Sequence, residues 1–171
     1  MIIKGNKIVI KTTKKEDLKH IQELWNNGEV MKWVGFPKGL NKSIDDVKKW
    51  WKNLQNNNLA KHFVVFTRDN EFCGEVFYKK DPDYVRASLD IKFSPEVQGK
   101  GMATESLKLL IYYIFKNEDK IDAVWTEPSE ENKAARNLYL RCGLEPKPRP
   151  NDMEIAETYW ELARKDWKDK V

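Results

Sequence analysis

Apolar and polar residues alternate along several short stretches of the chain, which is the pattern of a strand with one buried face. Residues 85–93 alternate most cleanly, and their side chains fall on two opposite faces: Ala87, Leu89, Ile91 and Phe93 on one, Arg86, Ser88, Asp90 and Lys92 on the other. Further strands are predicted at residues 7–11, 62–68, 72–80, 121–126 and 157–164. Asp69 and Asn70 separate two of them and predict a β-hairpin turn.

Apolar residues at helical spacing predict four helices. They run from the capping box Thr13-x-x-Glu16 to about Asn27-Gly28, from Ser43 to the asparagines at 56–58, from about Met102 to Phe115, and from Lys133 to about Arg141, before Gly143. The connector at residues 29–40, EVMKWVGFPKGL, is rich in aromatic residues and glycine. It either covers a site or anchors the core, and both interpretations stay open.

A strand, a helix and a second strand follow one another between residues 85 and 126. This order is normally a right-handed crossover that makes the two strands parallel, whereas the hairpin before it is antiparallel. A chain of 171 residues fits one domain, and no repeat or linker divides it. We therefore predict a single α/β (α+β) domain over residues 1–171, with a mixed central sheet flanked by helices.

Composition argues against several classes of function. The net charge of +4 comes from 31 basic and 27 acidic residues that are interspersed, so no nucleic-acid partner is predicted. Lysines interrupt the apolar runs near residue 1, so we expect no signal peptide and no membrane span, and a cytoplasmic protein. No cluster has metal-ligand spacing, so no metal is predicted, and Cys73 and Cys142 are expected to be buried thiols.

Residues 98–103, QGKGMA, join the strand that ends near Phe93 to the next helix. A glycine turn that opens a helix suits phosphate, because the first helical N–H groups lack acceptors and glycine permits close approach. A plain turn is the alternative. The segment is not a P-loop, since Gly101 follows Lys100. Thr104 breaks the dinucleotide fingerprint, which argues against a nicotinamide-dependent oxidoreductase.

Two motifs give the chain a family resemblance. Residues 98–103 match the Q/R-x-x-G-x-G/A signature of the GNAT superfamily of N-acetyltransferases. Residues 132–144, NKAARNLYLRCGL, resemble the family's N-x-x-A-x-x-L-Y-x-x-x-G-F segment, with Leu144 in place of phenylalanine. Together with EVMKWVG at residues 29–35, these motifs make the chain similar to the branch that contains ribosomal-protein alanine acetyltransferases and spermidine acetyltransferases.

The resemblance implies transfer of an acetyl group from acetyl-CoA to an amine within a ternary complex. It assigns Tyr139 as the general acid that protonates the leaving thiolate, with a buried helix aromatic as the alternative. It also implies that Asn132 binds the pantetheine arm; capping of its own helix is the alternative, and the two are compatible. The other cofactor-binding residues that it implies are Ile91, Phe93, Ser94, Gln98, Gly99, Lys100, Gly101, Met102, Ala103 and Thr104.

The resemblance does not supply a general base, because Ser88 occupies a position where this branch often has glutamate. Asp90 faces the same way and is our first choice, with Glu75 and Glu127 as alternates, although each can be a plain surface carboxylate. These acids would suit a cationic amine. The acceptor is left open among a protein N-terminus, a polyamine, an aminoglycoside and an amino acid. The oligomeric state is also left open, with a homodimer as one alternative. The alternative function is a CoA-binding module without catalysis.

Overall fold

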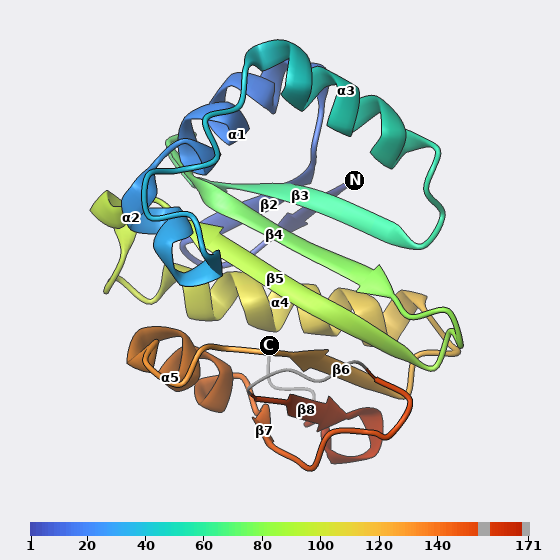
Figure 1. Cartoon of the computed structure of the whole chain (residues 1–171). Coiled ribbons are helices and arrows are strands. Elements are labelled where there is room, and N and C mark those ends of the chain that lie inside the picture. The colour runs from blue at the N-terminus through green and yellow to red at the C-terminus, as the bar shows by residue number, and fades with distance from the viewer. Residues whose placement is uncertain (154–157, 169–171) are drawn as a thin grey trace.

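The computed structural model describes residues 1–153 and 158–168, which form one mixed sheet of eight strands in the order β1-β2-β3-β4-β5-β6-β8-β7 (Figure 1). The strands are β1 Ile2–Lys4, β2 Ile8–Thr12, β3 Ala60–Thr67, β4 Phe72–Lys80, β5 Arg86–Phe93, β6 Ala123–Thr126, β7 Glu145–Pro146 and β8 Trp160–Ala163. The helices are α1 Leu18–Trp25, α2 Gly28–Met31, α3 Ile44–Gln55, α4 Met102–Asn117 and α5 Lys133–Arg141.

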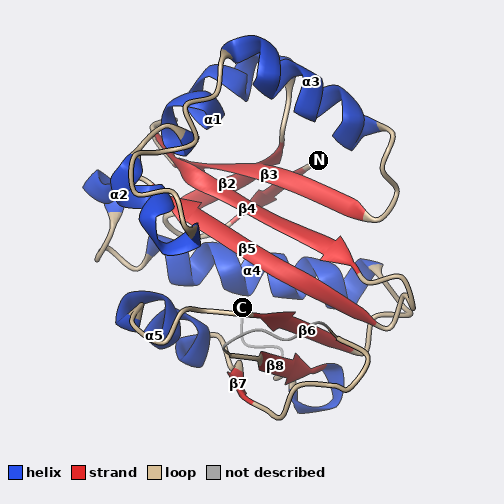
Figure 2. Ribbon diagram, in the orientation of Figure 1, coloured by secondary structure: helices blue, strands red, loops and turns tan. Residues whose placement is uncertain are grey.

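Helices cover both faces of the sheet: α1 and α3 lie over one face and α4 over the other (Figure 2). Strand β3 shows why its sequence is a continuous apolar run. Phe63 and Val65 pack in the core on the α4 side, whereas Val64 and Phe66 pack with α1 and α3. A strand that is buried on both faces needs apolar residues at successive positions.

The β5–α4–β6 crossover is the part of the fold that the sequence predicts best. β5 pairs with β6 in parallel, as expected, and pairs with β4 antiparallel. The apolar face of β5 packs in the α4 core, with Ala87, Leu89 and Phe93 buried and Ile91 against them. Half of the 16 residues of α4 are buried, so this helix faces protein around much of its circumference. The mixed α/β fold is thereby confirmed.

The predicted capping box at Thr13 and Glu16 is wrong. The Thr13 hydroxyl lies 2.6 Å from Nδ1 of His62 and also donates to the His62 carbonyl. The helix start is held one residue later, where the Lys14 N–H donates to the Asp17 carboxylate at 2.8 Å. Local spacing could not show this, because the partner of Thr13 comes from β3, 49 positions away.

Several short elements were missed or differ in extent. The connector at residues 29–40 begins with helix α2 and a 3-10 turn, Lys32–Val34, and strands β1 and β7 had no strand pattern of their own. The described part of the last strand covers residues 160–163, and residue 157 of the predicted strand lies outside the described residues. Both cysteines are buried, as predicted. Within residues 1–153 and 158–168, no helix is long and apolar enough to cross a bilayer.

Candidate active site

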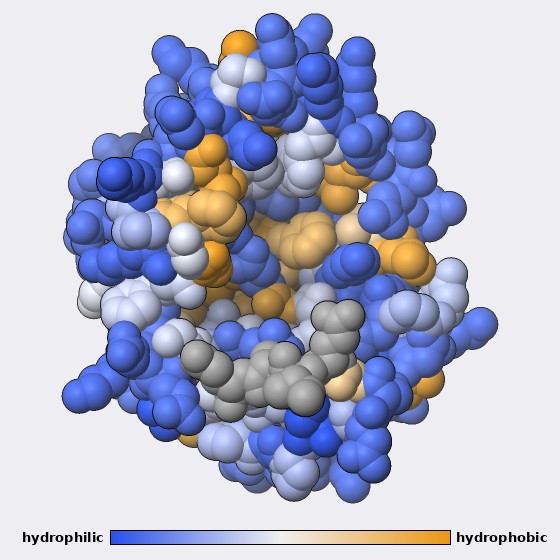
Figure 3. Space-filling view, in the orientation of Figure 1, coloured by the Kyte–Doolittle hydropathy of each residue, from blue (hydrophilic) through white to orange (hydrophobic). Residues whose placement is uncertain are grey.

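A cleft of about 730 Å³ opens along β5, between α5, the glycine turn before α4 and the α2 connector (Figure 3). Apolar side chains gather on the α2 side of the hollow. Trp33 and Val34 line the cleft although 43% and 50% of their surfaces are exposed. Met31, three residues into the connector, is buried. The connector therefore both anchors the core and borders a site.

The floor of the cleft is a sheet edge that β6 leaves open. The ladder between β5 and β6 covers residues 86–88, and from Leu89 to Phe93 the described strands pair β5 with β4 only. The Thr126 hydroxyl donates to the Leu89 carbonyl at 3.3 Å, and this hydrogen bond lies where β6 separates from β5. An open strand edge offers backbone donors and acceptors in a row, which an extended amide-bearing molecule can use.

The glycine turn lies at the end of this edge. Gly99 and Gly101 have φ angles of +77° and +79°, a left-handed conformation that residues with a Cβ rarely adopt. The N-cap of α4 is Gly101, and within residues 1–153 and 158–168 no side-chain cap forms at this helix start. Gln98 donates from its amide to the Phe93 carbonyl at 3.1 Å and ties the turn to β5. The turn thus has the features of an anion-binding helix start, provided by the backbone.

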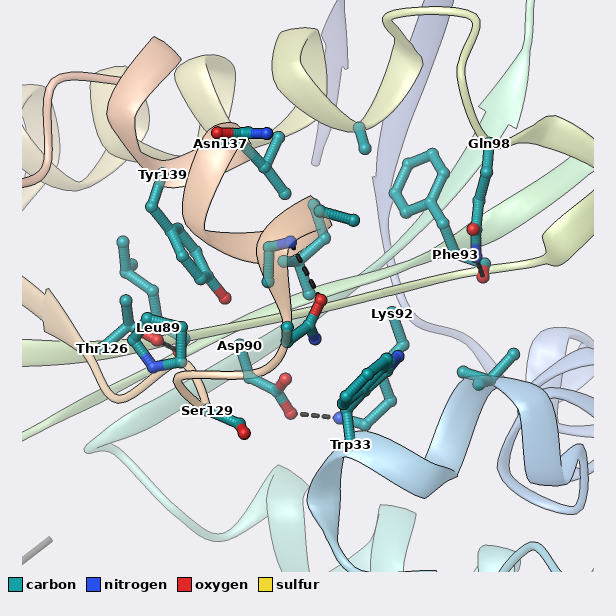
Figure 4. A pocket seen from close by; sticks show the side chains of 18 of the residues that line it. Trp33, Leu89, Asp90, Lys92, Phe93, Gln98, Thr126, Ser129, Asn137 and Tyr139 are labelled. Carbon is teal, nitrogen blue, oxygen red and sulfur yellow. Dashed lines mark hydrogen bonds and ion pairs between the residues drawn. The ribbon is translucent and has the colours of Figure 1, made fainter. Parts of the chain in front are cut away.

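Helix α5 brings two of the predicted residues to the cleft. The Asn132 side chain accepts from the Ala135 N–H at 3.0 Å, so this residue caps the helix and also lines the cleft. Tyr139 extends from α5 toward β5, as Figure 4 shows. Burial raises the pKa of the Tyr139 phenol to about 12, because the opposing hydrogen bond with Thr126 is the weaker influence. The phenol therefore keeps its proton at neutral pH.

A buried polar network on β3, β4 and β5 adjoins the cleft through Lys92. Glu75 is 2% exposed and accepts from Trp25 Nε1 at 2.8 Å, while its second oxygen lies 3.0 Å from His62 Nε2. Lys92, its cross-strand neighbour, places Nζ 3.4 Å from the same carboxylate. Burial alone would raise the pKa of Glu75, but His62, Lys92 and Trp25 outweigh it and lower the pKa to about 2.

The three candidate acids contact basic side chains, and Glu75 and Asp90 share one of them, Lys92. Asp90, which lines the cleft, forms an ion pair with Lys92, and Glu127 contacts Arg149 at 2.6 Å. Burial disfavours the charge on Lys92, but Asp90 and Glu75 outweigh it and raise the pKa of the ammonium. The expectation that these acids suit a cationic amine stays a prediction, because one ammonium, that of Lys92, serves two of the three carboxylates.

Most predicted residues line one cleft, but four do not. Those that line it are Asp90, Ile91, Phe93, Gln98, Gly99, Gly101, Ala103, Thr104, Glu127, Asn132 and Tyr139. Ser94, Lys100, Met102 and Glu75 fall outside the lining. Ser94 donates its N–H to the Cys73 carbonyl at 2.8 Å, and the Met102 sulfur lies 3.9 Å from that of Cys73. Ser94 and Met102 therefore lie against β4 and not in the cleft.

Sequence reasoning missed several lining residues. Trp33 and Val34 come from the connector, Trp125 and Thr126 from the end of β6, and Lys92 was noted only as a polar residue on β5. The aromatic content of the connector was the available signal for the first pair. Nothing in the local pattern around residue 125 indicated that β6 parts from β5 at that point.

The family described as "Acetyltransferase (GNAT) domain" matches residues 7–145, most of the chain, and the protein therefore belongs to the GNAT family of acetyltransferases. A spermidine N(1)-acetyltransferase of Escherichia coli strain K12 is 29% identical over 142 residues, which cover 82% of this chain and 74% of the relative. The resemblance drawn from the two motifs is confirmed.

Solved structures of related proteins share the fold. The spermidine N-acetyltransferase of Vibrio cholerae, in complex with CoA and spermine, has a TM-score of 0.81 at 20% identity, over 95% of this chain and 98% of that chain. A ribosomal L7/L12 alpha-N-protein acetyltransferase in complex with CoA has a TM-score of 0.79 at 16% identity, over 97% and 99%. At such identities the likeness concerns the architecture.

Proposed function

We propose that this protein is an acetyl-CoA-dependent N-acetyltransferase that moves an acetyl group to a primary amine within a ternary complex. One observation carries the proposal: the open edge of β5, the glycine turn before α4 and the phenol of Tyr139 meet in one cleft. The three features suit three parts of one molecule, namely the amides of pantetheine, the pyrophosphate and the thioester sulfur.

The residues present fit acetyl-CoA. Its pyrophosphate would accept from the N–H groups of the turn and of the first turn of α4, where the helix dipole favours an anion. Its pantetheine arm would add to the edge of β5 between Leu89 and Phe93. Asn132 uses Oδ1 for its helix cap, and its amide Nδ2, a donor, would bind a carbonyl of the arm. Solved relatives of the same fold hold CoA.

Tyr139 is the proposed general acid. In the transfer the amine nitrogen bonds to the acetyl carbon, the carbon–sulfur bond breaks, and the electron pair leaves with sulfur. The Tyr139 hydroxyl gives its proton to that sulfur, and a pKa of about 12 ensures that the proton is present beforehand.

Asp90 is the proposed general base. It lines the cleft, with 44% of its side chain exposed, so an acceptor ammonium can reach it. Glu75 suits the role poorly, because its carboxylate is held by His62 and Trp25, has a pKa of about 2 and does not line the cleft. A carboxylate with so low a pKa binds a proton only weakly at neutral pH.

We propose an acceptor with one reactive amine rather than a long polycation. Polycations need surplus negative charge, and the acids of the described lining, Glu29, Asp90 and Glu127, each have a basic partner. Trp33 adds an apolar surface beside the cleft. The named relatives include both spermidine and protein N-terminal acetyltransferases, so the two kinds of amine should be compared directly.

The decisive experiment is calorimetric titration with acetyl-CoA, with NAD as a control, followed by measurement of thiol release on addition of amines. The panel holds spermidine, monoamines with apolar bodies, and short peptides with a free N-terminus. We expect binding of acetyl-CoA alone and thiol release that requires an amine. Binding without release across the panel would favour a CoA-binding module, and absence of binding would refute the proposal.

A further inference from the structure

The turn between β1 and β2, residues 5–7, is fastened to the glycine turn that precedes α4. Lys7 donates from Nζ to the Lys100 carbonyl at 3.0 Å. Glu105, in the first turn of α4, accepts from the Lys7 N–H at 3.2 Å through each carboxylate oxygen, and from the Asn6 N–H. Two segments almost a hundred positions apart thus hold one another beside the proposed pyrophosphate site.

We propose that Lys7 and Glu105 are positioning residues that hold the glycine turn in its anion-binding conformation. The inference rests on the proposed function, because it concerns the pyrophosphate of acetyl-CoA. It assigns a binding role to a lysine that lies outside both sequence motifs. Lys7 is not among the residues that line the cleft, so it acts through the backbone of the turn.

The geometry of the peptide bond gives the mechanism. In a trans peptide the C=O and the N–H point in opposite directions. The Lys7 ammonium holds the Lys100 carbonyl, and it therefore fixes the direction of the Gly101 N–H, which points away from Lys7. Gly99 and Gly101 line the cleft, whereas Lys100 does not. Lys7 lies behind the turn, and a Cβ at Gly101 would be 3.6 Å from its Nζ.

Glu105 secures the position of Lys7. Its carboxylate accepts from the backbone of Asn6 and Lys7, which places the Lys7 side chain behind the turn. Glycine at position 5 leaves room for this carboxylate, since a Cβ there would lie 2.4 Å from the Glu105 carboxylate oxygen. A carboxylate near a pyrophosphate is repulsive by charge alone. We call the contacts of Lys7 and Glu105 with the two turns the clamp. If the clamp holds the turn, removing Glu105 weakens CoA binding, whereas charge repulsion alone predicts that its removal tightens binding.

The first test measures binding of CoA by calorimetry, which needs no acceptor. We expect Lys7→Met to raise the Kd about fivefold, as for loss of one charge-assisted hydrogen bond at an exposed position. Lys7→Arg should restore the Kd to within about twofold, because it retains a cationic donor. Lys4→Met is the matched control: it removes the same charge from an exposed position on β1 and should leave the Kd unchanged.

The second test separates positioning from a general loss of structure. S-acetylpantetheine carries the thioester and the arm but no pyrophosphate, so Lys7→Met should not alter its KM as an acetyl donor. Glu105→Ala should weaken CoA binding although it removes a negative charge. Tighter or unchanged binding in Glu105→Ala would overturn the clamp.

Other outcomes are equally informative. Equal losses in Lys7→Met and Lys4→Met, or equal losses with acetyl-CoA and S-acetylpantetheine, would overturn the role of Lys7. If the unaltered protein fails to bind CoA, the proposed function fails first, and that result is distinct from a failure of the clamp.

Discussion

The two halves of the cleft are built in different ways. The cofactor half takes its backbone donors from β5, the glycine turn and α4, which follow one another within residues 86–117. The acceptor half depends on side chains from separate segments: Trp33 comes from the connector, Asp90 from β5 and Glu127 from the segment after β6. A ligand that is bound by the backbone of one continuous segment requires a contiguous sequence motif. A ligand that is bound by side chains from distant segments requires no such motif.

Tyr139→Phe should have the largest effect, because it removes the proton donor and leaves the cofactor half intact. We expect kcat to fall about 1000-fold while the Kd for CoA stays within about twofold. Steady-state kinetics and calorimetry measure the two quantities. Tyr112→Phe removes the same hydroxyl from a position outside the cleft lining and serves as the control. Undiminished turnover in Tyr139→Phe would exclude Tyr139 from the chemistry.

Glu75→Gln should be the most destabilising change in the buried network beside the cleft, because it leaves Lys92 with one partner fewer. We expect the free energy of unfolding to fall by about 3 kcal/mol at pH 7. Glu71→Gln, an exposed carboxylate on the same hairpin, should change it little. Denaturant unfolding provides the measurement, and equal stability of the two variants would contradict the importance of the network.

The same carboxylate predicts a pH dependence. Its pKa is about 2 in the folded protein and 4.5 ordinarily, so the unfolded chain binds the proton more readily. The stabilisation is present above about pH 5 and is lost as the pH falls through 4.5 toward 2. Glu75→Gln should therefore flatten the stability profile between pH 5 and 2. A profile as steep as that of the unaltered protein would assign acid sensitivity to other groups.

Asp90→Asn tests where the base lies. We expect kcat/KM for the amine to fall about 100-fold, with CoA binding unchanged. The difference in kcat/KM between Asp90→Asn and the unaltered enzyme should become smaller at higher pH, because the amine is then already deprotonated. Asp69→Asn, in the exposed hairpin turn, is the control. A difference of constant size across the pH range would indicate that Asp90 binds the acceptor instead of removing its proton.

Trp33→Ala should have the smallest effect and the most selective one. Trp33 lines the acceptor side of the cleft, and we expect its removal to raise the KM for apolar monoamines about fivefold without changing that for acetyl-CoA. Phe36→Ala is matched to it, since Phe36 is 47% exposed in the same connector but does not line the cleft. Equal effects of the two variants would remove Trp33 from acceptor binding.

Local patterns predicted much of the fold. The alternation in β5, the periodicity of α4 and the Ser43 cap of α3 were confirmed, because each depends on residues within a few positions of one another. Strands β1 and β7 are three and two residues long and exist through their pairing with β2 and β8. Thr13 likewise bonds to His62 instead of capping its own helix.

The sequence by itself determined the family, the glycine turn and the α5 segment that carries Asn132 and Tyr139, because those features are written in contiguous residues. Tertiary structure alone decided where β6 parts from β5, which carboxylate is buried and which is reachable, and that Lys7 lies behind the glycine turn. Such outcomes depend on contacts between distant segments. The free energy of those contacts comes from packing and charge pairing across the sheet, which local spacing does not encode.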